Sequence, residues 1–111
     1  MPHGVTDFDF LFANNASSLL LNDITSLDVT LELPAGDGDL FPDPIYGEQF
    51  AVTLRHPSTG EIEIMWCRRK FYGDSLEVVR GREGTAAIAF PANTVVAHQI
   101  TAGTLEYLRD L

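Results

Sequence analysis

The alternation of apolar and polar residues along the chain predicts a protein built mainly of short β-strands. The clearest run covers residues 27–33, where polar side chains separate four apolar ones: Leu27, Val29, Leu31 and Leu33. A period of two residues is typical of a strand that buries one face. Further strand-like runs begin at Leu19 and cover residues 50–54, 61–68, 76–80 and 95–98. We therefore expect about six short strands separated by turns.

Turns and loops are predicted between these runs. Residues 14–18 are typical of a turn or linker, and residues 56–60 of a hairpin turn. Residues 34–47 contain three prolines and three glycines, which repeatedly interrupt strand pairing, so we expect a long ordered loop there. Four apolar residues of this loop are expected to fold back onto the core: Leu40, Phe41, Ile45 and Tyr46.

A short helix is predicted near the end of the sequence. Thr101 is a suitable N-cap, and Ala102, Leu105 and Leu108 fall on one face of the helix that would follow it. Together, these patterns predict a mainly β fold. It is a small β-barrel or β-sandwich of about six short strands, with a short C-terminal helix and an extended N-terminal arm. We assign the arm to residues 1–16 and the β domain to residues 17–111.

The arm is rich in large apolar side chains. Phe8, Phe10 and Phe12 recur at every second position, and Leu11 adds a fourth apolar side chain. A terminus that exposed them would be prone to aggregation. We therefore expect the arm to contact a second copy or a neighbouring protein, for example by adding a strand to a sheet edge. The alternative is that the arm covers the core of its own domain.

Charge is distributed unevenly along the 111 residues. The net charge is −9, and residues 1–54 contain nine acidic residues and no Lys or Arg. Nucleic acid is a poor partner for such a chain, because phosphate binding needs clustered positive side chains. The basic cluster of Arg68, Arg69 and Lys70 beside an acidic lobe suits a protein surface, including a second copy of the chain. A simpler alternative is that the acidity keeps a small domain soluble.

Nothing in the sequence points to a membrane. No apolar run approaches the roughly 20 residues of a membrane-spanning helix. The first basic residue is Arg55, so no basic region precedes an apolar stretch, as it would in a signal peptide. We expect no membrane partner, and we expect the chain to stay in the compartment that made it unless it leaves within a larger assembly.

The cysteine and histidine positions give no metal or disulfide pattern. The single cysteine, Cys67, lies in an apolar run and is expected to be a buried free thiol. The three histidines, His3, His56 and His98, have no metal-ligand spacing, and His98 is expected to be a half-buried strand residue.

Acidic and nucleophilic residues give no clear site either. Asp37, Asp39 and Asp43 are the best candidates for calcium ligands, but the set of oxygen ligands is incomplete, so a solvated acidic loop is favoured. No serine lies in a motif that would supply a base and an orienting partner. We expect no enzymatic activity, cofactor, bound metal or small-molecule substrate.

Residues 76–87, LEVVRGREGTAA, carry a family resemblance. They resemble L-x-V-x-R-G-x-E-G-T-x-A, a signature of a small β domain in virion proteins of tailed bacteriophages. Residues 91–105 are similar to the segment P-A-G-T-x-V-x-H-x-L-T-A-x-x-L that tends to follow it, with Asn93 in place of the usual glycine. The similarity covers about residues 17–110. It is looser before residue 76, and residues 66–70 depart from the family's hairpin.

The resemblance implies a structural role. In this family the domain occurs in tail fibre, tail-tip and baseplate proteins, usually at the end that docks the fibre to the tail. We therefore expect a tail or baseplate adaptor of the virion, made in the host bacterial cytoplasm. It would assemble as a symmetric homo-oligomer and contact other tail proteins. An acidic inhibitor or DNA mimic that binds a nucleic-acid-handling protein is the alternative, because the net charge is −9.

Specific residues follow from the same segment. Gly81 and Gly84 are expected where the chain turns sharply out of a strand. Arg80, Arg82 and Glu83 are expected either to hold that turn or to reach a neighbouring subunit.

Overall fold

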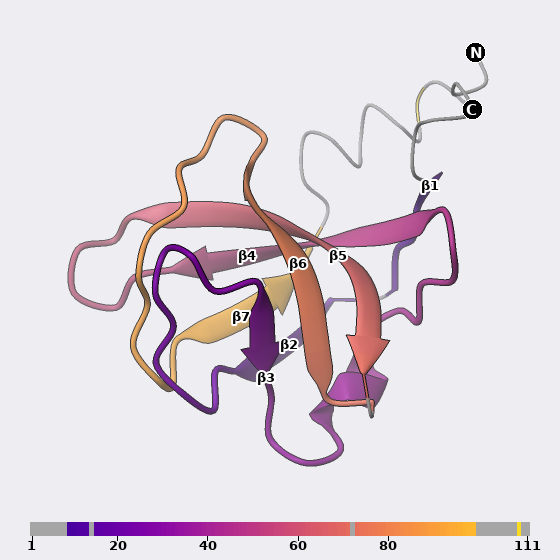
Figure 1. Ribbon diagram of the computed structural model, residues 1–111, viewed down its shortest axis with the longest axis horizontal. Helices are drawn as coiled ribbons and strands as arrows, with labels where there is room; N and C mark the ends of the chain where they lie inside the picture. The colour runs from indigo at the N-terminus through magenta and orange to yellow at the C-terminus, as the bar shows by residue number, and fades with distance from the viewer. Residues whose placement is uncertain (1–8, 14, 72, 100–108, 110–111) are drawn as a thin grey trace.

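Figure 1 shows the computed structural model, which describes residues 9–13, 15–71, 73–99 and 109. These residues form seven strands and a short 3-10 helix. The elements in chain order are β1 (Asp9–Phe10), β2 (Ala16–Leu19), β3 (Thr30–Glu32), η1 (Asp37–Leu40), β4 (Glu48–Arg55), β5 (Ile62–Phe71), β6 (Ser75–Arg82) and β7 (Val95–His98). The predicted mainly β fold is confirmed, whereas the predicted C-terminal helix begins at residue 101, and residues 100–108 lie outside the described residues.

The strands form a curled, mainly antiparallel sheet in the order β2-β7-β4-β5-β6-β3. β1 pairs with the start of β4 in parallel orientation. The sheet curls until its two edges approach each other, and the Leu21 N–H donates to the Glu32 carbonyl across the gap at 2.8 Å. The result is a half-barrel whose interior holds the core, in keeping with the need to protect sheet edges.

The core includes the inward-facing side chains of the long central strands. On β5 the buried residues Glu63, Met65 and Cys67 alternate with the partly exposed Ile64 and Trp66. The inward side chains meet those of the other strands in one cluster, with Leu31, Phe50, Leu54, Leu76, Phe90 and Val96 almost completely buried. The strands predicted at residues 50–54, 61–68, 76–80 and 95–98 are confirmed.

The prediction was wrong at two places near the N-terminal side of the sheet. Residues 16–18 belong to β2 rather than to a linker, because they pair with β7. Leu27 and Val29 do not face the core, since their side chains are 86% and 51% exposed. The Asp28 carboxylate accepts the Thr25 N–H at 2.8 Å and thereby folds residues 25–28 into a turn, which leaves only Thr30–Glu32 as a strand.

The long loop of residues 34–47 is held through its backbone. The Asp74 carboxylate accepts the N–H groups of Gly36 and Gly38 at 3.1 and 2.9 Å. The ammonium of Lys70 donates to the carbonyls of Gly38 and Phe41 at 2.9 and 3.3 Å. A side chain at Gly38 would collide with the backbone of residues 73 and 74. Because polar groups fix the loop, it needs little apolar cover.

The apolar residues of that loop correct our expectation. Phe41 is buried and stacks on Phe50 at a ring distance of 6.0 Å. Leu40, Ile45 and Tyr46 instead point outward, with 51%, 68% and 103% of their surface exposed. Only one of the four residues therefore contributes to the core.

Candidate functional site

Glu63 and Arg80 form an ion pair on the inner side of the β5–β6 ladder. Two parallel hydrogen bonds join the guanidinium to the carboxylate, each 2.8 Å long. The side chains are 0% and 8% exposed. Buried charges of this kind are stable only when their remaining hydrogen-bonding groups also have partners.

Backbone groups satisfy the rest of the pair. The Glu63 carboxylate also accepts the N–H groups of Gly81 and Ile88, both at 2.9 Å. The Arg80 guanidinium donates to the carbonyls of Thr25, Asp28 and Ile88 at 2.8, 2.6 and 2.6 Å. The pair thus joins β5 and β6 to residue 88 and to the turn at residues 25–28.

This arrangement decides between the two roles expected for Arg80 and adds Glu63 to the important residues. Arg80 was named as a candidate interface residue, with a role in holding its own turn as the alternative. Its side chain faces inward and joins parts of the fold, so the alternative holds. Glu63 was missed by the sequence analysis. Its signal was an acidic residue in phase with Met65 and Cys67 on a strand, opposite an arginine in phase with Leu76 and Val78.

Gly81 forms a β-bulge in β6. Ile64 pairs with Arg82 and Trp66 pairs with Val79, so β6 contains one extra residue in this interval. Gly81 has φ 58°, and Gly84 in the turn that follows has φ 83°, conformations that favour glycine. The extra residue reverses the inside–outside order of the strand, so Arg82 emerges on the face opposite to Arg80.

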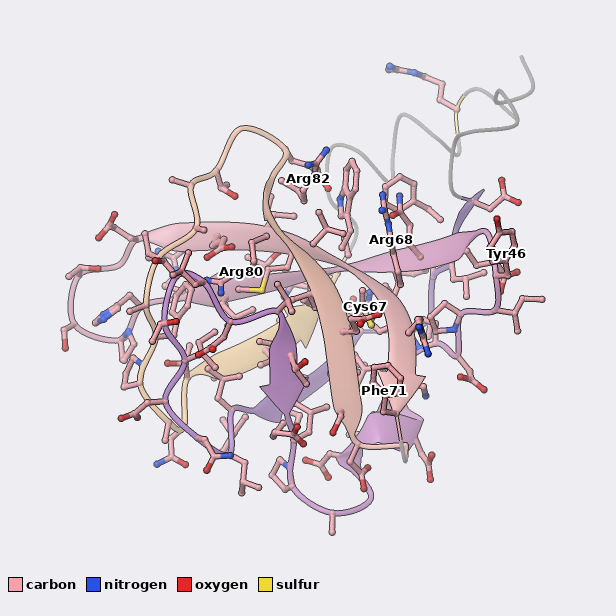
Figure 2. All side chains as sticks on the ribbon, in the orientation of Figure 1. Tyr46, Cys67, Arg68, Phe71, Arg80 and Arg82 are labelled. Atoms are coloured by element: carbon pink, nitrogen blue, oxygen red, sulfur yellow. The ribbon has the colours of Figure 1, made fainter. Side chains whose placement is uncertain are left out.

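Trp66 is the centre of the outer face. The Arg82 guanidinium lies 4.5 Å from its ring centroid, and Phe10 meets the ring edge to face at 5.2 Å. The Trp66 Nε1–H donates to the Glu83 carboxylate at 2.9 Å. Figure 2 shows Arg82 and Arg68 on the same side of the sheet. Three of the predicted interface residues, Phe10, Arg82 and Glu83, therefore contact one tryptophan, and Arg68 lies on the same side of the sheet as Arg82.

Arg68 occupies a second bulge, in β5. It is the extra residue between the pairs Cys67–Val78 and Arg69–Glu77. Its Nε donates to the Gln49 side chain at 3.0 Å. Burial lowers the pKa of Arg68, and the positive charge of Arg82 lowers it further.

The three consecutive basic residues have different environments. Arg68 is half-buried, and Lys70 is committed to the loop at residues 38–41. Arg69 is 64% exposed, lies 4.6 Å from the centroid of the Phe71 ring, and is 3.8 Å from the Glu77 carboxylate. Arg69 is therefore the member of this cluster best placed to meet a partner.

A hollow lies beside Arg69. Its volume is about 490 Å³, and its lining comprises Pro44, Ile45, Tyr46, Gly47, Arg68, Arg69, Lys70 and Glu77. Tyr46 projects from the turn just before β4, at the edge of the molecule in Figure 2. We call this hollow, together with the projecting Tyr46, the Tyr46 surface. Tyrosine and arginine are the residues enriched at the centres of protein interfaces.

The described part of the arm, residues 9–13, runs along its own domain. The Asp9 N–H donates to the Gly47 carbonyl at 2.8 Å, and the Leu11 N–H donates to the Gln49 carbonyl at 2.7 Å. Leu11 packs against the core cluster. For these residues the alternative that the arm covers its own core therefore holds, while Phe8 lies outside the described residues.

His98 connects the arm to the core. Its Nε2 accepts the Ala13 N–H at 3.1 Å, so the proton sits on Nδ1, which donates to the Ala51 carbonyl at 2.7 Å. The rings of Phe12 and Phe50 lie 5.0 and 5.4 Å away. The residue is 0% exposed rather than half-buried, and this burial lowers its pKa below the ordinary 6.5.

Two further candidate groups, Cys67 and Asp37, have structural positions in the fold. Cys67 is a buried free thiol, as predicted, and burial raises its pKa to about 12. The Asp37 carboxylate accepts the Ser18 hydroxyl at 2.6 Å. Within residues 9–13, 15–71, 73–99 and 109, no group of three His, Cys, Asp or Glu side chains is placed to hold a metal ion. The same residues contain no helix long and apolar enough to cross a membrane.

Comparison with known proteins does not assign the chain to a family. No protein-family model matches it, and no curated protein is significantly similar in sequence.

Proposed function

We propose that this chain is a structural protein of a phage tail or baseplate, a small adaptor that docks fibre or tail-tip components. Its action is binding through a rigid β scaffold, with no chemical step.

The observation that carries the proposal is the structural use of the segment behind the family resemblance. Arg80, Gly81, Glu83 and Thr85 each bond to another part of the sheet: Arg80 and Gly81 to Glu63, Glu83 to Trp66, and Thr85 to the Ile64 N–H at 2.9 Å. A motif whose residues stabilise a turn suits a module that serves as a scaffold. It leaves partner recognition to the exposed residues elsewhere.

The hydrogen bonds made by the carboxylates argue against the alternative function, a DNA mimic. Mimicry needs carboxylates arrayed along one exposed face. Several carboxylates of this chain are instead engaged within the fold: Asp23, Asp28, Asp37, Glu48, Glu63, Asp74 and Glu83. The acidic charge therefore has structural uses in addition to its effect on solubility.

The test is the composition of purified phage particles. Particles from cells that carry the gene are separated into heads and tails, and their proteins are identified by peptide mass spectrometry. We expect the chain in the tail fraction. A stop codon at Trp66 should give particles without tails or without fibres, and a suppressor strain should restore them. Absence of the chain from purified particles, or normal particles with the stop codon, would contradict the proposal.

A further inference from the structure

A projecting side chain and a hollow lie next to each other on the Tyr46 surface. Tyr46 is 103% exposed, so it makes almost no contact with its own chain. The hollow, about 490 Å³, lies against the same turn and continues to Arg69 and Glu77. An exposed tyrosine beside a space large enough to receive a tyrosine from another molecule is the arrangement that a self-complementary surface requires.

The turn that carries Tyr46 is held rigidly. The Glu48 N–H donates to the Ile45 carbonyl, and the Glu48 carboxylate accepts the Ile45 N–H, both at 2.9 Å. Gly47, at φ 88°, allows the tight turn, and its carbonyl accepts the Asp9 N–H. Because the side chain is presented on a fixed backbone, its burial by a partner costs little additional ordering of the chain.

Charged side chains of both signs belong to the elements that form this surface. Arg69 is exposed at the hollow, and Asp39 and Asp43 are exposed residues of the loop whose residues 44–47 line that hollow. The Lys70 ammonium holds that loop in place through the carbonyls of Gly38 and Phe41. When positive and negative groups are adjacent on one surface, a two-fold axis that passes between them brings each sign opposite the other.

We propose that the Tyr46 surface binds the Tyr46 surface of a second copy around a two-fold axis. Tyr46 of each copy enters the hollow of the other and packs near its Arg69. Asp39 and Asp43 of each copy face the same arginine. This inference deepens the proposed function and rests on it for the biological setting of the dimer.

Sedimentation equilibrium of the purified chain tests the proposal directly. We expect a monomer–dimer equilibrium, measured at about 0.15 M salt so that the general repulsion between two copies of net charge −9 is screened. Tyr46→Ala should raise that constant about tenfold or more, the effect of a central aromatic residue. Leu27→Ala is the matched control, since Leu27 is 86% exposed outside this surface, and it should leave the constant unchanged.

Charge-reversal variants test whether the surface that meets the hollow belongs to a second copy of the chain. Arg69→Glu alone and Asp39→Lys with Asp43→Lys should each weaken self-association. A mixture of the two variants should form a heterodimer, because the reversed charges then face each other.

Three results would overturn the proposal. The first is a wild-type chain that stays monomeric at millimolar concentration, and the second is a dimer insensitive to Tyr46→Ala. The third is a monomeric wild type whose attachment to tails is abolished by Tyr46→Ala, which would assign the hollow to a different tail protein. None of these results changes whether the chain is found in purified tails, so the proposed function is tested separately.

Discussion

Arg80 and Arg82 are two residues apart on β6, yet their side chains lie on opposite faces of the sheet. Arg80 faces inward, is 8% exposed, and forms two 2.8 Å bonds to the buried Glu63 carboxylate. Arg82 faces outward and lies on the Trp66 ring, and the buried Nε of its guanidinium has no hydrogen-bond partner among the residues that the structure describes. Hydrogen bonds hold the Arg80 side chain in place, whereas the Arg82 side chain is held mainly by its contact with the Trp66 ring.

The difference teaches how a single glycine can divide a charged motif between two faces. Without the extra residue at Gly81, positions 80 and 82 would share one face of the strand. Two arginines would then compete for one buried carboxylate, and one buried cation would lack compensation. The bulge gives the core one charge and leaves the other for the surface.

The largest expected effect comes from breaking the inner pair. Arg80→Met should lower the free energy of unfolding by about 3–5 kcal/mol, because it leaves the Glu63 carboxylate buried without its counter-charge. Urea unfolding followed by far-UV circular dichroism measures the change. Arg55→Met is the matched control at an exposed arginine and should change the free energy by about 0.5 kcal/mol or less. A loss below about 1 kcal/mol for Arg80→Met would mean that the pair does not hold the two strands together.

An intermediate effect on the free energy of unfolding is expected when the pH is lowered, because the unfolded chain protonates His98 more readily than the folded protein does. Burial lowers the pKa of His98 below 6.5, so the unfolded chain takes up a proton at a pH where the folded protein does not. The contribution to stability is therefore present above about pH 6.5 and decreases as the pH falls below that value. A proton on Nε2 would also oppose the Ala13 N–H and weaken attachment of residues 9–13.

Urea unfolding between neutral pH and about pH 5.5 measures this effect before most carboxylates titrate. His98→Gln, which retains a donor and an acceptor, should show a smaller loss of stability over the same interval. Equal pH dependence in the two proteins would show that other groups cause the loss.

The smallest effect is expected on the outer face. Arg82→Met repeats the substitution made at position 80, but here it removes a cation–π contact worth about 0.5–1 kcal/mol. The methionine side chain can still cover part of the Trp66 ring. We expect a decrease of at most about 1 kcal/mol in the free energy of unfolding. A decrease equal to that of Arg80→Met would remove the distinction between the two faces.

The strands were predictable where burial alternates along them, as in β7 and the first half of β5, because a period of two reports burial of one face. The bulges at Gly81 and Arg68 were not, since they depend on which residue of the neighbouring strand is paired. The outward position of Tyr46 was missed for another reason. Apolar character suggested burial, but Asp74 and Lys70, distant in the sequence, fix the loop through its backbone. Arg80 faces inward because it pairs with the buried Glu63. The burial of Glu63 could have been predicted only from its alternation with Met65 and Cys67.

Because Cys67 is buried in the central sheet, the rate at which its thiol is modified reports how often the sheet opens. Cys67 pairs with Phe50 on one side and Val78 on the other, and it is 0% exposed. Its thiol, with a pKa of about 12, reacts with a water-soluble reagent only after the neighbouring strands separate and the thiolate forms in water. The rate of modification therefore counts opening events of the central sheet, and its ratio to the rate in the unfolded chain gives the free energy of opening. One natural sulfur atom can thus compare the opening of β4–β5–β6 with global unfolding, without the introduction of a probe.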